Sequence, residues 1–323
     1  MKAVVAKKYG PPEKVLAVCE VPKPSPKEKE VLIKIHATAI NDYDWGAVTG
    51  KPYLYRLLFG LTKPKHPIAG MELSGVVEEV GAGVEKLKSG DAVYGDISAH
   101  GFGSFAEYIC VPENAVMKKP GNMSFEDATA IPHASMLALQ ALRDKAKIRQ
   151  GEKVLINGAG GGVGMFGLQL AKLYNCEVTG VDAGEKLDMM KSIGFDQVID
   201  YKKENFTKSG LQYDLILDCK SNQSPSSYLR SLKTKGRYIT VGGEIPALIK
   251  ILFMGKAFSL FSSKKLQILS LKPNNGLEYI SELFAQGKIR CIIDGPYTME
   301  DIPKLIRYFA EGKHKGKVVV KMC

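Results

Sequence analysis

The chain has 323 residues, of which 45% are hydrophobic and 24% charged, and its 45 basic and 34 acidic residues give a formal net charge of +11. This composition excludes a disordered or low-complexity chain, and the length is enough for two domains with separate cores. The lysines are spread along the whole chain and do not cluster beside aromatic residues, so the charge favours a solvated surface suited to an anionic cofactor over a nucleic-acid-binding face.

The first third of the chain has the pattern of short strands separated by turns. We expect strands at 31–39 and 74–80, a third strand that ends near Tyr94, and a fourth at 104–111. This pattern predicts a compact, partly open β barrel over residues 1–124.

After Ser124 the pattern changes to strands that alternate with helices. We expect strands at 153–157, 177–182, 197–200, 213–219, 236–241 and 266–271. The alternation predicts a parallel, doubly wound sheet over residues 125–273. The tail at 274–323 has two helical and two strand-like segments, and we assign it to the first domain, which leaves a cleft between the two domains.

The segment from 153 to 164 is the most informative part of the chain. A strand-like run, a loop with four glycines and an amphipathic helix follow one another, as in a dinucleotide-binding βα unit. The glycines let the backbone approach a pyrophosphate, whose charge is stabilised by the N–H groups at the start of the helix. We predict cofactor contacts at Ala159, Gly160, Gly161, Gly162, Val163 and Gly164. The next strand ends in Asp182, where such a unit places the residue that binds the ribose.

Cysteine spacing and the N-terminus favour a cytoplasmic protein. The six cysteines are widely spaced without a C-x-x-C pair, which is typical of reduced thiols and not of a disulfide framework or zinc site. The apolar part of the N-terminus is too short for a signal peptide. The most apolar region, 245–261, is shorter than the ~20 residues needed to span a bilayer. We expect it to form a subunit contact or pocket lid, and peripheral membrane contact is the alternative that stays open.

Motifs along nearly the whole chain resemble those of medium-chain dehydrogenases/reductases of the zinc-free quinone oxidoreductase type. They include Gly70-Met-Glu-Leu-Ser-Gly-Val-Val, Gly90-Asp-Ala-Val, Gly103-Ser-Phe-Ala-Glu-Tyr, the glycine loop, and Gly312-Lys-His-Lys-Gly-Lys-Val-Val. The resemblance implies a GroES-like barrel plus a Rossmann domain, a homodimer, and NADPH or NADH as cofactor.

Zinc-dependent members of this family have a cysteine where this chain has Asn41 and a histidine where it has Met71. The lobe that carries their structural zinc is missing, and the five histidines match no zinc spacing. We therefore expect no catalytic zinc. Without a metal, hydride delivery onto an electrophilic carbon is the easier reaction, which favours a quinone or an α,β-unsaturated carbonyl as substrate.

The resemblance also implies roles for individual residues. Asn41 is the first candidate hydrogen-bond donor to the substrate oxygen on which negative charge develops. Tyr43 and Tyr53 are second-rank proton donors. His133 is positioned in the sequence where it could shuttle a proton, but we expect it to be an exposed or helix-capping residue.

The residues that would decide between NADPH and NADH favour different cofactors. Asp182 favours NADH, because it can bind the ribose hydroxyls and would repel a 2′-phosphate. Lys186 and Tyr201 match positions where quinone oxidoreductases hold that phosphate and flank the adenosine. The resemblance adds contacts from Val241, Gly242, Gly243 and Lys317. We expect both cofactors to be accepted, with NADPH modestly favoured.

Two other functions stay open at this point. One is a zinc-independent alcohol or aldehyde oxidoreductase of the same fold. The other is a cofactor-binding protein with a non-catalytic role, such as RNA binding.

Overall fold

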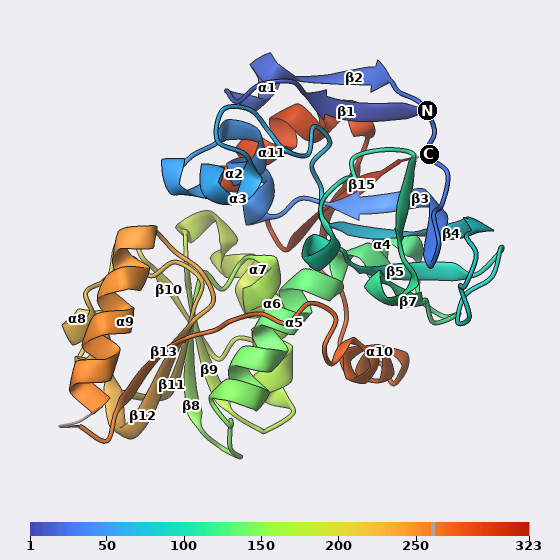
Figure 1. The fold of residues 1–323 in the computed structure, drawn as a ribbon. Helices are drawn as coiled ribbons and strands as arrows, with labels where there is room; N and C mark the ends of the chain where they lie inside the picture. The colour runs from blue at the N-terminus through green and yellow to red at the C-terminus, as the bar shows by residue number, and fades with distance from the viewer. Residues whose placement is uncertain (260–261, 323) are drawn as a thin grey trace. The chain divides into compact units, whose positions relative to one another are not determined.

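The computed structural model describes residues 1–259 and 262–322, which form two compact units (Figure 1). Unit 1 comprises Met1–His133, Pro273–Ala285 and Cys291–Cys323, and unit 2 comprises Ala134–Lys272 and Gln286–Arg290. Unit 1 extends past residue 124 because α4 (Phe125–Ala130) packs against its sheet. The backbone carbonyl of Phe125 accepts a 2.6 Å hydrogen bond from Ser74 Oγ, which ties this helix to the barrel.

Unit 1 is built around a seven-stranded sheet in which strands from both ends of the chain meet. The order is β14-β15-β3-β4-β5-β7, and β6 also pairs with β3. The bounds are β3 (Glu30–Ala39), β4 (Glu72–Val80), β5 (Ala92–Asp96), β6 (Tyr108–Pro112), β7 (Met117–Lys118), β14 (Ile293–Tyr297) and β15 (Lys317–Lys321). A separate two-stranded sheet pairs β1 (Lys2–Ala6) with β2 (Leu16–Glu20).

The core of unit 1 explains why its long third strand forms. In β3 the alternate residues Val31, Ile33 and Ile35 are fully buried, so the strand presents a continuous apolar face to the core. The C-terminal strand β15 pairs antiparallel with β3, with Val319 opposite Ala39. The remaining helices of this unit are α1 (Pro12–Val15), α2 (Asp42–Thr49), α3 (Arg56–Phe59), α10 (Leu277–Ala285) and α11 (Ile302–Ala310), and a 3-10 turn, η1 (Tyr53–Tyr55), precedes α3.

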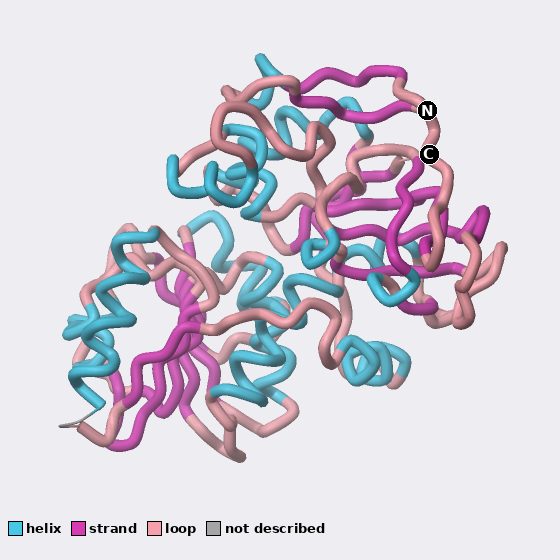
Figure 2. Tube along the Cα trace, viewed as in Figure 1, coloured by secondary structure: helices cyan, strands magenta, loops and turns pink. Residues whose placement is uncertain are grey.

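Unit 2 confirms the predicted Rossmann sheet. Its six strands are all parallel and run in the order β10-β9-β8-β11-β12-β13, with helices on both faces (Figure 2). The strand order reverses between β8 and β11, which is where a doubly wound fold binds its ligand. The strands are β8 (Lys153–Asn157), β9 (Glu177–Asp182), β10 (Gln197–Asp200), β11 (Tyr213–Asp218), β12 (Leu232–Thr240) and β13 (Lys265–Ile268).

The helices of unit 2 connect these strands. They are α5 (Pro132–Leu139), which starts at the junction of the two units, α6 (Gly162–Lys172), α7 (Leu187–Ser192), α8 (Pro225–Arg230) and α9 (Ile245–Ser259). The apolar segment predicted at 245–261 is therefore mostly helix α9, and its last two residues lie outside the described part of the chain. Among the described residues, no helix is both long and apolar enough to cross a membrane.

Candidate active site

The glycine loop joins β8 to α6 at the carboxyl edge of the sheet in unit 2. Gly158 has a left-handed backbone with φ of 87°, so a side chain there would be strained. At Gly164 an added Cβ would lie 2.5 Å from the backbone of Ala159, which only glycine allows. These contacts hold the first turn of α6 directly against the loop, and this close packing points the N–H groups of the helix start at the space where a pyrophosphate would lie.

Asp182 ties this loop to the neighbouring strand. Its Oδ2 accepts a 2.8 Å hydrogen bond from the backbone N–H of Gly160, and its Oδ1 accepts one of 2.8 Å from Ala183. Lys186 Nζ lies 3.3 Å from Asp182 Oδ1, and both side chains are buried, with 3% and 7% exposed. Burial lowers the pKa of Lys186, although the charge of Asp182 opposes this effect. The carboxylate is therefore neutralised within the protein.

The other predicted cofactor residues of unit 2 collect at the same edge. Tyr201 follows β10, is half exposed, and donates its backbone N–H to the carbonyl of Asp182 over 3.2 Å. Val241 follows β12, and the carbonyl of Gly242 accepts a hydrogen bond of 2.7 Å from Ser221 Oγ. The structure thus brings the glycine loop, Asp182, Lys186, Tyr201 and the Val241–Gly243 turn together, and their contacts to a cofactor stay predictions.

Unit 1 contains a buried polar cluster that sequence patterns did not predict. It consists of Asn41, Asp44, Glu72, Asp96, His133 and Lys317, each at most 4% exposed. Asp44 accepts backbone hydrogen bonds from Asn41 at 2.8 Å and Gly70 at 3.0 Å. Burial raises the pKa of Asp44 to about 7 against the opposing effect of these bonds.

Asn41 and Lys317 both contact Glu72 inside this cluster. Asn41 Nδ2 donates to Glu72 Oε2 at 2.8 Å and to the carbonyl of Ala39 at 3.3 Å, so both amide hydrogens have protein acceptors. Lys317 Nζ donates to Asn41 Oδ1 and forms an ion pair with Glu72. In this arrangement Asn41 positions Glu72 and Lys317. The predicted contact of Asn41 to the substrate and that of Lys317 to the cofactor stay predictions.

His133 is buried, and our expectation of an exposed or capping histidine is wrong. Its backbone N–H donates to Glu72 Oε1 over 2.6 Å, and Nδ1 lies 2.8 Å from Asp96 Oδ2. Its Nε2 lies 3.8 Å from a carboxylate oxygen of Asp42, whose side chain is 64% exposed. Burial alone would lower the pKa of His133, but the Asp96 hydrogen bond and the surrounding carboxylates outweigh burial and raise it. The sequence did not reveal this burial because Asp96, at the end of β5, is far from His133 in the chain and meets it only in the tertiary structure.

The two candidate tyrosines occupy different environments. The ring of Tyr43 lies edge-on to His133, with 6.0 Å between ring centroids, and burial raises its pKa to about 12. Tyr53 is 68% exposed beneath the guanidinium of Arg56. The structure therefore brings Tyr43, but not Tyr53, to the buried polar cluster.

The residues at the zinc-ligand positions do not fit zinc. Met71 offers only a weak thioether ligand for a divalent ion, and the oxygen of Asn41 is engaged by the ammonium group of Lys317. A positive charge at that oxygen opposes a divalent cation. Within the described residues, no group of three or more His, Cys, Asp or Glu side chains is arranged to hold a metal ion.

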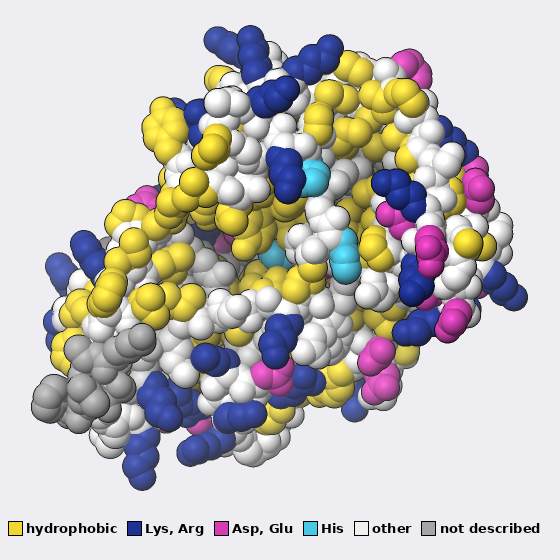
Figure 3. Space-filling model, in the orientation of Figure 1, with side chains coloured by type: hydrophobic (Ala, Val, Ile, Leu, Met, Phe, Trp, Pro, Cys, Tyr) yellow, Lys and Arg dark blue, Asp and Glu magenta, His cyan; other side chains and the backbone are white. Residues whose placement is uncertain are grey.

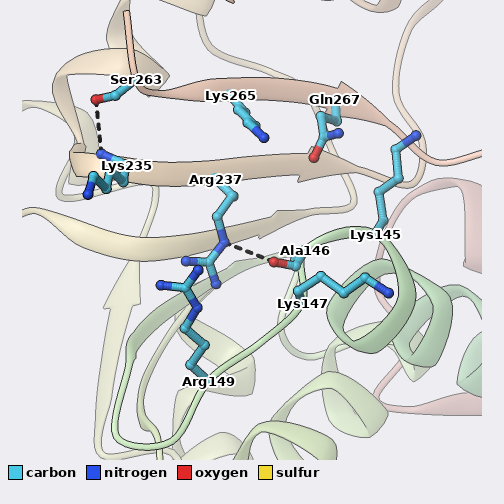
Figure 4. Close-up of a pocket in the computed structure, with 9 residues that line it drawn as sticks. All are labelled: Lys145, Ala146, Lys147, Arg149, Lys235, Arg237, Ser263, Lys265 and Gln267. Atoms are coloured by element: carbon cyan, nitrogen blue, oxygen red, sulfur yellow. Dashed lines mark hydrogen bonds between the residues drawn. The ribbon is translucent and has the colours of Figure 1, made fainter.

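A separate pocket of about 310 Å³ lies at the opposite, amino-terminal edge of the sheet in unit 2 (Figure 4). Cationic side chains from three segments line it, namely Lys145, Lys147, Arg149, Lys235, Arg237 and Lys265. Arg237 is held by a two-point ion pair with Glu152, with distances of 2.7 and 2.6 Å. Because the glycine loop follows the carboxyl ends of the strands, this basic pocket is distinct from the predicted cofactor contacts.

Comparisons with known proteins agree with this architecture. Residues 27–121 match the alcohol dehydrogenase GroES-like domain, and residues 193–320 match the zinc-binding dehydrogenase family model. A chloroplast envelope quinone oxidoreductase homolog from Arabidopsis thaliana is 30% identical over 99% of this chain and 98% of its own length. A 2-methylene-furan-3-one reductase from Solanum lycopersicum is 33% identical over 99% of this chain and 79% of its own length.

A solved structure is similar to this chain over its whole length. The quinone oxidoreductase from Coxiella burnetii has a TM-score of 0.87 and 27% identity, with 100% of this chain and 99% of that chain covered. The name of one matching family model refers to zinc, yet the positions of the zinc ligands hold Asn41 and Met71 here. The chain belongs to the medium-chain dehydrogenase/reductase superfamily, in its quinone oxidoreductase-like branch.

Proposed function

We propose that this protein transfers hydride from NADPH or NADH to a quinone or an α,β-unsaturated carbonyl compound without zinc. The observation that carries the proposal is that one chain has both a dinucleotide-type glycine loop, in unit 2, and a buried polar cluster that does not fit a metal, in unit 1. Relatives support the substrate class. Among them are the quinone oxidoreductase homolog and the furanone reductase described above, and an NADPH-dependent alkenal/one oxidoreductase from Arabidopsis thaliana that is 30% identical.

The carboxyl edge of unit 2 would hold the dinucleotide. The loop at 159–164 supplies backbone N–H groups for the pyrophosphate, and Val241–Gly243 supplies backbone groups for the carboxamide. When bound, the nicotinamide supplies the hydride. We propose that NADPH is modestly favoured because Lys186 neutralises Asp182, which removes the repulsion that a bare carboxylate would exert on a 2′-phosphate.

Reduction also requires a proton, and we assign it to the Asp96–His133 pair with Tyr43. Hydride addition leaves negative charge on the substrate, and His133 in its imidazolium form can neutralise that charge by giving up its Nε2 proton. Asp96 holds Nδ1 and stabilises the imidazolium, and Asp42, which is exposed and 3.8 Å from Nε2, would return the proton from solvent. Tyr43, with its raised pKa, stays protonated and is a hydrogen-bond donor at neutral pH.

Cofactor oxidation tests this function directly. NADPH absorbance is followed with a quinone, an enone and an aldehyde, and we expect turnover with the first two. Preferred turnover of the aldehyde would favour the alcohol/aldehyde oxidoreductase alternative. Cofactor binding without turnover of any of them, combined with strongly salt-dependent RNA affinity, would favour the non-catalytic alternative.

We also propose a homodimer joined along the Rossmann sheet. β13 is an edge strand, and the adjacent helix α9 exposes Ile249, Leu252 and Phe253 at 48%, 49% and 69%. A second copy that pairs with this edge would cover the unpaired backbone groups and these side chains. Light scattering coupled to size exclusion tests the proposal, and a monomeric mass for the wild type would contradict it.

A further inference from the structure

One short segment of unit 1 exposes an unusual number of large hydrophobic side chains. Of the twelve such exposed side chains among the described residues, five lie between positions 53 and 61. They are Tyr53, Leu54, Leu57, Leu58 and Leu61, and these residues are 68%, 51%, 69%, 67% and 68% exposed, in that order. Isolated exposed hydrophobic residues are normal, but a contiguous group marks an interaction site. We call this group the leucine patch.

The leucine patch is held on a fixed support. An aromatic side chain of the same segment points inward. Phe59 is only 6% exposed, and its ring contacts those of Tyr55 and Phe102, with centroid distances of 6.0 and 5.4 Å. The carbonyl of Gly60 accepts a 2.6 Å hydrogen bond from the hydroxyl of Tyr9. Because the inward side chains and the backbone are anchored, the leucines are presented outward by a folded element and not by a frayed loop.

The stretch of sequence that contains the leucine patch carries charge of one sign. Residues 45–71 contain no Asp or Glu, whereas Lys51, Arg56, Lys63 and Lys65 lie within or beside the patch. The Arg56 guanidinium lies over the rings of Tyr9 and Tyr53, at 4.8 and 4.9 Å from their centroids. Hydrophobic side chains gather over the region of α2 and α3, with basic side chains at its margin (Figure 3). Apolar tips, tyrosines and flanking cations together are the composition of a segment that lies in a membrane interface.

We infer that the leucine patch docks onto the surface of an anionic lipid bilayer. The cations would face the negative headgroups, and the leucines would enter the boundary between headgroups and acyl chains. A second copy of this chain is a poorer occupant, since it would bring four more positive charges to the same contact. A protein partner is also disfavoured, because five side chains are few beside the roughly 20–30 residues that each side contributes to a standard interface. This inference concerns location and does not depend on the proposed reaction.

Vesicle flotation of the full-length protein tests the inference. The probes are phosphatidylcholine vesicles with and without phosphatidylglycerol. We expect binding only to the anionic vesicles, with a loss of about tenfold or more in Leu57→Ser/Leu58→Ser, since two apolar insertions are removed. Lys63→Gln/Lys65→Gln should weaken binding less and reduce its salt dependence. The matched control is Val18→Ser/Leu211→Ser, which removes two exposed apolar side chains outside the leucine patch and should leave binding unchanged.

A second readout keeps the test independent of folding failure. Leu57→Trp places an indole at the tip of the patch, and we expect its fluorescence to shift to shorter wavelength with anionic vesicles but not with neutral ones. Circular dichroism and NADPH affinity check that each variant is folded. Absence of wild-type binding to anionic vesicles would overturn the inference, and so would equal losses in the patch variant and the Val18/Leu211 control.

Discussion

Among the described residues there are two buried pairs of a lysine with a carboxylate, one in each unit, and they are built differently. Asp182 ends β9, and Lys186 lies four residues later in the turn that follows this strand. Lys317 and Glu72 come from β15 and β4, which are far apart in the sequence and lie on either side of β3. Asp182 also accepts two backbone N–H bonds, whereas Lys317 depends on Glu72 and the side chain of Asn41.

This comparison separates a local charge site from one that requires the whole fold. The Asp182 pair is anchored in the backbone of the glycine loop, so its geometry follows from one βα unit. The Glu72 pair connects side chains of several segments and also positions His133 through its backbone N–H. Loss of one partner should therefore lower the free energy of unfolding more in unit 1 than in unit 2.

The largest expected effect is on stability when Glu72 is removed. Glu72→Ala leaves the ammonium group of Lys317 buried without its carboxylate, which should lower the free energy of unfolding by about 3–5 kcal/mol. Urea unfolding measures the change. Glu126→Ala is the control, because its pair with Lys321 is partly exposed and should contribute within about 1 kcal/mol.

A double variant sharpens this result. Glu72→Leu/Lys317→Met removes both charges and should recover part of the stability lost in Glu72→Ala. Equal destabilisation by Glu72→Ala and Glu126→Ala would mean that burial does not distinguish the two pairs.

The next effect concerns turnover and its pH dependence. His133→Asn should lower kcat by roughly 10²-fold, because the proposed proton donor is lost. The carboxylates around His133 raise its pKa, so the wild type should keep its imidazolium to higher pH than an ordinary histidine and lose turnover as pH rises through that raised pKa. The variant should lack this decline. His66→Asn, which changes a histidine outside the cluster, is the control, and a variant profile identical to that of the wild type would remove His133 from the reaction.

Cofactor preference should change less. Lys186→Ala leaves the charge of Asp182 unbalanced, so kcat/KM for NADPH should fall about tenfold while that for NADH changes little. Lys202→Ala removes an exposed lysine paired with Glu185 and is the matched control. A wild type that prefers NADH, with Lys186→Ala silent, would mean that Asp182 alone sets the choice.

The smallest expected effect is that of metal removal. Asn41 and Met71 stand at the zinc-ligand positions, and Lys317 places a positive charge beside them, so chelation should leave kcat unchanged. Elemental analysis and activity after dialysis against a chelator measure this. One tightly bound zinc per chain, with activity lost on its removal, would contradict the prediction.

The parts of this protein that the sequence determined are those governed by short-range rules. Alternating apolar strands and helices predicted the parallel sheet. The glycines at 158–164 predicted a tight strand-to-helix turn, because positive φ at Gly158 and close backbone approach at Gly164 need glycine. Phosphate binding by this turn stays a prediction. Asp182 was found for the same reason, since its distance from the loop is fixed by one helix and one strand.

The tertiary structure alone decided the buried polar cluster. Asn41, Glu72, Asp96 and Lys317 follow four different strands or lie within them, and His133 lies in helix α5. No periodicity in the sequence relates these five buried residues. His133 looked like a surface residue because the sequence does not reveal that Asp96 and Glu72 lie beside it. Strand pairing across the sheet of unit 1 brings these side chains together, and burial then makes each polar atom depend on a partner from a distant segment.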